Sequence, residues 1–283
     1  MIKKLITFFI LYFIVFLWNA FSASIPVEQV FSDVSKDYKY YNELQTLYDK
    51  GMITPDNQWR FNPKKLLNRD EFVWIMMEVS CKKCISPNVW YDFIQKYSDS
   101  TLFFDINKTN KYFYCIAWAD DNWFVKWYDP STKCEDGTYM TWEKPFCPNN
   151  TIILEEALAV ILRASWILTN SEADSIRLKI ASWQITENLS DDVTPKNLDG
   201  SVYSFYPDFQ RALDYELVEY DKYWNEKIYK LIEVIDGKIR PKQAITKEEF
   251  LRIAYIALKS NSCNEKKEDK LGLEMNILNK SCT

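Results

Sequence analysis

The chain repeats one layout three times, and this repetition limits its possible folds more than any other feature of the sequence. Each copy opens with Asp-Val or Asp-Ile, continues with an aromatic-rich amphipathic segment and reaches a proline through an irregular stretch. A glutamate then follows each proline at a constant distance of eight positions. The pairs are Pro63 and Glu71, Pro148 and Glu156, and Pro241 and Glu249. Such a period indicates a repeat architecture whose insertions fall in surface loops.

The apolar residues that follow each proline recur at helical spacing. They are Phe72, Ile75, Met76 and Val79 in the first copy, Leu158, Ile161 and Leu162 in the second, and Phe250, Ile253, Ala254, Ala257 and Leu258 in the third. Steps of three and four residues place these side chains on one face of a helix. The sequence therefore predicts that each copy closes with a helix that buries this face.

Start signals for these helices are present in two of the copies. Asn68 with Glu71, and Thr246 with Glu249, have the spacing of a capping box. The second copy has Leu154 at the register of the basic residue and lacks a cap residue there. A further capping box from Ser171 to Asp174 predicts an extra helix between the second and third copies.

The first residues have the layout of a secretory signal peptide. Lys3 and Lys4 precede an apolar run over residues 5–17, and a stretch of small residues ends at Ala23. An uncleaved membrane anchor is the other interpretation, but the run is short for a span of about 20 residues. We expect cleavage after residues 1–23 and no membrane span in the mature chain.

These signals divide the chain into six segments. They are a signal peptide at 1–23, repeat one at 24–84, repeat two at 100–169, a connecting helix at 170–188, repeat three at 189–260 and a polar tail at 261–283. The tail ends in an alternating apolar pattern at 271–277 that is typical of a strand. It is interpreted either as disordered or as the start of a further C-terminal domain.

Charge and residue types exclude several classes of function. The net charge is −5, whereas general nucleic-acid binding needs a basic surface. The chain has no histidine that could activate a serine or cysteine nucleophile, and no glycine-rich phosphate loop. We therefore expect neither catalysis nor a cofactor, and no nucleic-acid partner.

Seven cysteines in an exported chain favour disulfides, with at least one thiol left without an internal partner. Cys134 and Cys147 are the preferred pair, because both lie in one irregular loop segment that a short bridge would stabilise. The alternative is an all-cysteine zinc site that combines this pair with Cys81 and Cys84.

Tryptophan is common and glycine is scarce in this chain. There are 11 tryptophans and 5 glycines, whereas ordinary usage predicts about 20 glycines. Trp59 falls where the third copy has Gly237, counting back from the proline. Four tryptophans stand at predicted turns, namely Trp59, Trp123, Trp127 and Trp166. They are interpreted as glycines encoded by UGA, which some bacterial lineages read as glycine; the other interpretation is core aromatics or sugar-stacking platforms.

The order of helix, loop, Phe-x-Pro element and capped helix resembles the S-layer homology domain. In the first copy the resemblance rests on residues 31–34, 47–53, 61–63 and 68–72. The third copy matches over 239–257, and the second keeps Phe-x-Pro at 146–148. The resemblance covers roughly residues 30–260. It implies a mainly α fold of three helix-loop-helix repeats in a pseudo-threefold arrangement, with short strands or loops in the insertions.

The resemblance also implies a function and a site. The family attaches exported proteins to the cell envelope, often by binding pyruvylated cell-wall polysaccharide in grooves between lobes. Its basic residue at the helix start contacts the acidic sugar, and free backbone N–H groups there favour an anion on physical grounds as well. The predicted glycan-binding residues are Arg69, Lys247, Asn68, Thr246, Glu71 and Glu249. Leu154 predicts a weak groove in the second copy.

The leading hypothesis is a non-catalytic, exported anchoring module at the cell surface whose partner is an envelope polysaccharide. One alternative is the N-terminal targeting portion of a longer surface enzyme or adhesin. Another is an exported metal-binding or small-molecule-binding protein that uses its cysteines.

Overall fold

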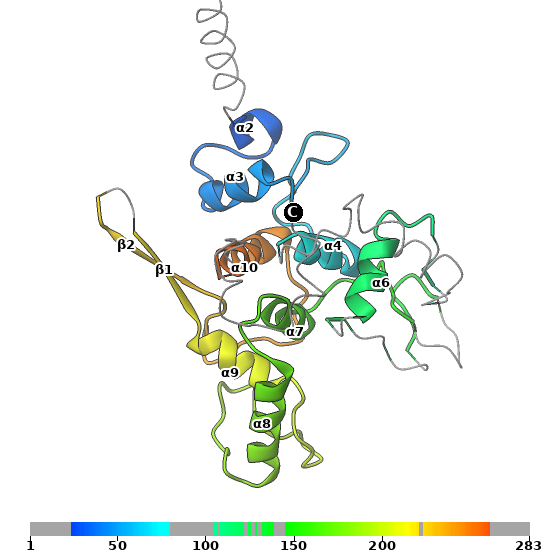
Figure 1. Ribbon diagram of the computed structural model, residues 1–283, viewed down its shortest axis with the longest axis vertical. Coiled ribbons are helices and arrows are strands. Elements are labelled where there is room, and N and C mark those ends of the chain that lie inside the picture. Colours follow the sequence, from blue (N-terminus) through cyan, green and yellow to red (C-terminus); the bar gives the residue numbers. More distant parts are fainter. Residues whose placement is uncertain are drawn as a thin grey trace, which may run out of the picture. The chain divides into compact units, whose positions relative to one another are not determined.

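The computed structural model describes residues 24–79, 103, 105–106, 108–121, 124–125, 128, 132–138, 145–220 and 223–260. These residues form eight α-helices and one two-stranded sheet, so the described part of the protein is mainly α (Figure 1). The predicted signal peptide and tail lie outside the described residues. Within the described ranges, no helix is both long and apolar enough to span a bilayer.

The chain divides into two compact units, residues 1–62 and 63–283. The first unit contains α2 (Val27–Val30) and α3 (Tyr41–Asp49), which pack against each other. Its core is built on Phe31, whose ring meets the rings of Tyr48 and Phe61 edge-on, with centroids 5.7 and 5.8 Å apart. Leu44 and Leu47, three positions apart on α3, are fully buried, as expected for one face of an amphipathic helix.

The second unit contains the remaining elements. They are α4 (Arg69–Val79), α6 (Phe113–Asp121), α7 (Leu154–Ala164), α8 (Asn170–Ala181), α9 (Tyr206–Asp214), β1 (Glu216–Tyr220), β2 (Glu226–Lys230) and α10 (Lys247–Ser260). Helices α4, α7 and α10 pack against one another, while α6 packs on α4, and α9 packs on both α7 and α8 (Figure 1). The three closing helices predicted from apolar spacing are thus confirmed as α4, α7 and α10.

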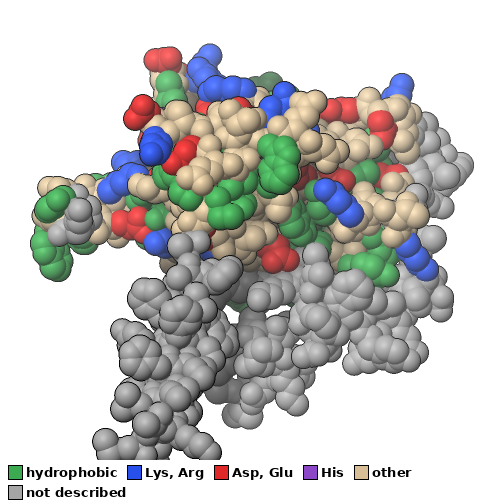
Figure 2. All heavy atoms as spheres, turned by 90° about the horizontal axis from the view of Figure 1, so that it is seen from above, with side chains coloured by type: hydrophobic (Ala, Val, Ile, Leu, Met, Phe, Trp, Pro, Cys, Tyr) green, Lys and Arg blue, Asp and Glu red, His purple; other side chains and the backbone are tan. Residues whose placement is uncertain are grey.

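A hairpin lies in the insertion of the third copy, where short strands or loops are predicted. Strands β1 and β2 pair antiparallel, with Val218 opposite Ile228. Tyr229, on the other face, is buried against the ring of Tyr255 at 5.4 Å. The hairpin projects from the body of its unit, and Figure 2 shows hydrophobic side chains toward its far end.

The segments that precede α4, α7 and α10 form a closed cycle of backbone hydrogen bonds. The Leu67 N–H donates to the Ile245 carbonyl at 3.1 Å, and the Ile245 N–H donates to the Ile152 carbonyl at 3.1 Å. The Ile152 N–H donates back to the Leu67 carbonyl at 3.0 Å. All three residues are buried, so the cycle satisfies polar groups that would otherwise be costly to bury.

The first amides of the three helices continue this pattern. Each donates to a backbone carbonyl of a neighbouring segment, from Arg69 to Asn150, from Leu154 to Gln243 and from Lys247 to Lys65, all at 2.9 Å. Helix N-termini need such partners because their first N–H groups have none within the helix. The predicted Asn68 capping box does not form: among the described contacts Asn68 makes no side-chain cap bond, and the Glu71 N–H that the box would bind donates to the Asp70 carboxylate at 2.7 Å. The Thr246 box is confirmed, with the Glu249 N–H donating to Thr246 Oγ1 at 3.3 Å.

The aspartate that opens each copy binds the backbone just before the corresponding proline. Each carboxylate accepts hydrogen bonds from two backbone N–H groups. Asp33 accepts from Phe61 and Asn62, Asp105 from Phe146 and Cys147, and Asp192 from Ile239 and Arg240. The distances lie between 2.6 and 3.0 Å. The residue before each proline has a positive φ, between +56° and +65°. We call these three contacts the aspartate clamps.

The connecting helix begins earlier than its predicted capping box. Thr169 is the N-cap of α8: its Oγ1 accepts the Glu172 N–H at 3.2 Å, and Glu172 accepts the Thr169 N–H at 2.8 Å. The box predicted at Ser171 and Asp174 is wrong. Asp174 instead lies within α8 and pairs with Arg177 at 2.7 Å.

Candidate functional site

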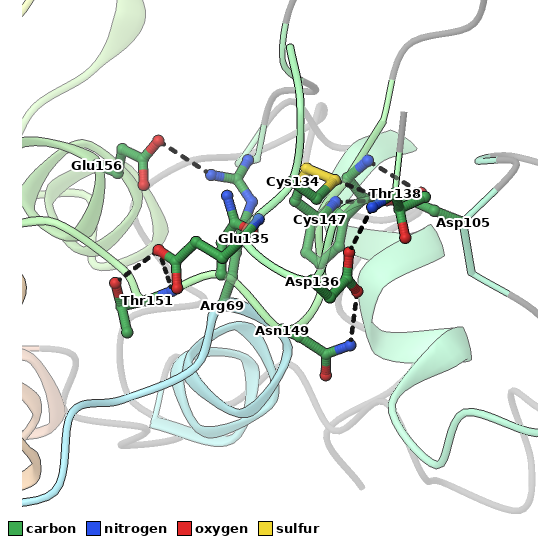
Figure 3. Close-up of a disulfide and its surroundings, with 12 residues drawn as sticks. Arg69, Asp105, Cys134, Glu135, Asp136, Thr138, Cys147, Asn149, Thr151 and Glu156 are labelled. Carbon is green, nitrogen blue, oxygen red and sulfur yellow. Dashed lines mark hydrogen bonds and ion pairs between the residues drawn. A yellow bond between two sulfur atoms is a disulfide. The ribbon is translucent and has the colours of Figure 1, made fainter. Parts of the chain in front are cut away.

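Arg69, the first residue of α4, is held in a buried ion pair. It is 5% exposed, and its guanidinium lies 3.2 Å from the Glu156 carboxylate on α7 (Figure 3). The same guanidinium lies over the rings of Tyr128 and Phe146, 4.4 and 4.9 Å from their centroids. Burial raises the pKa of Tyr128 to about 12, so this phenol stays neutral beside the cation.

Lys247, the first residue of α10, makes the corresponding contact with α4. Its Nζ lies 2.8 Å from Glu71 Oε1, and the two side chains are 16% and 22% exposed. Leu154 opens α7 at the third such position and lines a small cleft with Glu249. The Glu249 carboxylate is already engaged, because it accepts the Thr246 N–H at 2.7 Å.

The structure therefore distributes the predicted site residues over different contacts between helices. Glu71 contacts Lys247, and Glu249 contacts Thr246. Arg69 contacts Glu156, which is not among the predicted site residues. Both predicted cations are neutralised by a carboxylate of a neighbouring helix. A ligand carboxylate at either position competes with that glutamate.

A shallow cleft of about 440 Å³ lies beside the third aspartate clamp. Its walls come from the opening loop of the third copy and from the segment around Pro241, and they consist of Asp192, Thr194, Asn197, Tyr203, Arg240, Pro241, Lys242 and Gln243. This set combines two cations, a carboxylate, two amides and an aromatic ring. We call it the Arg240–Lys242 cleft.

The cations of the cleft differ from Arg69 in their exposure. The Lys242 side chain is 72% exposed although Nζ is paired with Glu155, which is 3% exposed. Tyr203 Oη donates to the other oxygen of the Glu155 carboxylate at 2.5 Å. Burial is the larger cause, and this hydrogen bond the next, that raises the pKa of Tyr203. Arg240 is exposed, and among the described residues its guanidinium makes no ion pair. The cleft therefore offers positive charge to solvent.

The clamp carboxylate of Asp192 stays ionised in this cleft. Burial acts to raise its pKa, but the N–H groups of Ile239 and Arg240 and the hydroxyl of Ser190 outweigh that effect, so the pKa lies below its usual value. Sequence reasoning missed these residues. One available signal is the lysine that directly follows the proline in the first and third copies, Lys64 and Lys242; Lys64 pairs with Glu248 as Lys242 pairs with Glu155.

Figure 3 shows the loop that contains Cys134 and Cys147. Their sulfur atoms are 2.01 Å apart, and the Asp105 carboxylate accepts the Cys147 N–H at 2.6 Å. The loop is also fastened by Glu135, whose carboxylate accepts from the Thr151 hydroxyl at 2.9 Å.

The ligand atoms of Asp105, Cys134 and Cys147 lie within 4.8 Å of one another. A zinc ion needs thiolates, and bonded sulfurs supply none, so this geometry fits the disulfide interpretation better than the zinc alternative. Cys81 and Cys84, the other half of the predicted zinc site, lie outside the described residues.

Comparison with known proteins adds one match. Residues 30–73 match the family model of the S-layer homology domain, and no curated protein matches the chain. The matched segment runs from the first aspartate clamp to the first turn of α4 and includes Pro63.

Proposed function

Because residues 30–73 form an S-layer homology domain, a non-catalytic module that attaches proteins to cell-envelope polymers, we propose that this chain anchors at the cell surface by binding an acidic envelope polysaccharide. The match is the observation that carries the proposal. We further propose that the chain is exported by residues 1–23, which are removed, and that it has no catalytic role of its own.

We propose that two divergent copies of the domain follow the matched one. The closed cycle through Leu67, Ile152 and Ile245 supports this, because it relates three segments that stand at the same distance after their prolines. The aspartate clamps support it independently, since each copy uses the same residue type for the same pair of backbone bonds. Both observations support a pseudo-threefold arrangement of α4, α7 and α10.

We place the polysaccharide in the Arg240–Lys242 cleft. A sugar carboxylate would gain charge-assisted hydrogen bonds from Arg240 and Lys242. Sugar hydroxyls suit Asp192 and Asn197, and Tyr203 offers a ring edge or face.

The prediction that Arg69 and Lys247 contact the glycan through the helix N-termini remains a second location for the same function. The burial and pairing of Arg69 favour the cleft, because the cleft also offers Arg240, which is exposed and makes no ion pair among the described residues.

Co-sedimentation with purified cell-wall sacculi tests the proposal. The variant Arg240→Ala/Lys242→Ala should bind at least about tenfold more weakly, since a hydrogen bond to a charged group contributes about 1.5–3 kcal/mol. The matched control is Lys227→Ala/Lys230→Ala, which removes the same charge from the hairpin and should bind like the parent. Binding should also weaken with added salt.

Two outcomes would contradict this assignment. Equal sedimentation of the parent and the cleft variant removes the cleft from the proposal. Loss of binding only in a folded Arg69→Ala/Lys247→Ala variant moves the site to the helix N-termini. If the parent does not sediment with sacculi at all, the proposed function itself is wrong.

A further inference from the structure

Four tryptophans of the described residues have a backbone conformation that tryptophan rarely adopts. They are Trp59 (φ +57°), Trp166 (+56°), Trp183 (+61°) and Trp224 (+64°). Their side chains are exposed by 64%, 61%, 70% and 83%. The left-handed region is open to glycine but strained for residues with a Cβ, most of all for bulky ones. The other non-glycine residues that the structure describes in the left-handed region are Asp236, whose residue type this region tolerates, and the three residues before the prolines.

Trp166 and Trp183 each end a helix in the way that glycine usually does. In both cases the tryptophan is the C′ residue of a Schellman motif, with the paired bonds of that motif. The same two bonds follow α3, where Gly51 is the C′ residue. After α7, the N–H groups of Trp166 and Ile167 donate to the carbonyls of Arg163 and Leu162, at 3.1 and 2.9 Å. After α8, those of Trp183 and Gln184 donate to Ile180 and Lys179, at 3.1 and 2.8 Å. After α3, those of Gly51 and Met52 donate to Tyr48 and Leu47, at 2.8 and 2.9 Å.

Trp59 occupies the position that Gly237 occupies in the third copy. Each lies four residues before the proline of its copy, with φ +57° and +75°. Each also accepts a backbone hydrogen bond from the residue that precedes its clamp aspartate, from Ser32 at 2.6 Å and from Asp191 at 2.8 Å. The two turns have the same structure, and one of them is built with glycine.

Trp224 lies in the loop of the hairpin. Tyr220 pairs with Glu226, so five residues connect the strands. Short hairpin loops place a residue with positive φ where the second strand begins, and glycine is favoured there. Trp224 has that φ and an almost fully exposed indole, with Asn225 following it.

We propose that Trp59, Trp166, Trp183 and Trp224 are glycines in the protein as its native host makes it, because their codons are UGA read as glycine. The same reading changes the composition from 5 glycines beside 11 tryptophans to 9 beside 7, closer to ordinary usage. It also removes four exposed indoles from the surface, so none of these positions is a platform for stacking sugars. Trp123 and Trp127, predicted on the same grounds, lie outside the described residues. The backbone N–H of Phe124, the residue after Trp123, donates to the Ala119 carbonyl at 2.9 Å. In a Schellman motif after α6, this is the bond that the C″ residue makes.

The codons and the native protein test this proposal directly. UGA at the four positions, together with peptide masses from the native host that show glycine there, supports it. UGG codons, or peptide masses that show tryptophan, overturn it.

A stability comparison tests the structural reasoning without the native host. In the recombinant tryptophan form, Trp166→Gly and Trp183→Gly should each raise Tm by about 2–4 °C, the shift expected for relief of about 1 kcal/mol in a chain of this size. The matched control is Trp74→Gly within α4, where the indole stacks on Tyr112 with centroids 5.5 Å apart; this change should lower Tm. If Trp166→Gly and Trp183→Gly lower Tm as the control does, the glycine assignment from backbone geometry is wrong.

Discussion

Replacing Arg69 with alanine should destabilise the second unit severely, quite apart from any effect on binding. The change leaves Glu156 without its partner at a site where the arginine is 5% exposed and the glutamate side chain 15% exposed. It also removes the cation from the rings of Tyr128 and Phe146.

The expected cost follows from this burial. Breaking a buried ion pair by removing one partner costs about 3–5 kcal/mol, because a charge remains buried without compensation. A typical domain is stable by about 5–15 kcal/mol, so the variant should keep only part of its stability. In a chain of this size the loss corresponds to a fall in Tm of about 10 °C.

Urea denaturation followed by circular dichroism measures the effect. Lys230→Ala is the matched control: it also breaks an ion pair, with Glu216 at 3.0 Å, but the two side chains are 48% and 43% exposed. An exposed pair contributes about 0–1 kcal/mol. The reasoning is refuted if Arg69→Ala costs no more than Lys230→Ala.

A double variant separates the buried charge from the lost contact. Leu154 shows that an apolar residue is accepted at the corresponding position of α7. Arg69→Leu/Glu156→Leu should therefore be more stable than Arg69→Leu alone, because it buries no unpaired carboxylate. Equal or greater destabilisation of the double variant would mean that shape, not charge, dominates at this site.

Three further results are expected. Asp192→Ala should cost about 1–2 kcal/mol because two backbone amides lose their acceptor, whereas the neighbouring Asp191→Ala should cost little. The pKa of Asp192 is lowered in the folded state, so its contribution is full above the ordinary aspartate pKa and is lost as pH falls through the folded value; unfolding at several pH values checks this. Thr169→Ala should cost about 1 kcal/mol by removing the α8 cap, seen as faster amide exchange in its first turn. Non-reducing peptide mapping should recover Cys134 linked to Cys147, and reduction of that bond should cost about 3 kcal/mol; free thiols at both residues would contradict the pairing.

Local patterns in the sequence predicted the helices well and their mutual contacts poorly. The apolar spacing after each proline was sufficient to place α4, α7 and α10, because amphipathic helices carry their period in adjacent residues. The capping box predicted at Asn68 does not form, because the Glu71 N–H that it would bind donates to the Asp70 carboxylate at 2.7 Å. The partner of the first helix amide cannot be read from local sequence, because the Arg69 N–H donates to the Asn150 carbonyl, 81 positions away.

The candidate site shows the same limit. Arg69 was singled out correctly as a charged residue at a helix start, but its burial depends on Glu156, Tyr128 and Phe146, which lie in the second copy. The Arg240–Lys242 cleft forms only when the loop around Asp192 folds back onto the segment near Pro241, about 50 residues later. Burial and charge at both places are set by tertiary pairing.

The cycle of hydrogen bonds before α4, α7 and α10 determines when the second unit can fold. Leu67 donates to Ile245 across 178 positions of sequence, so the cycle cannot close until nearly the whole described chain is available. A chain that leaves the cell unfolded and N-terminus first would wait for its third segment before this cycle could close. Single copies expressed alone should likewise fail to fold stably, because each would expose the backbone groups that its two neighbours otherwise satisfy.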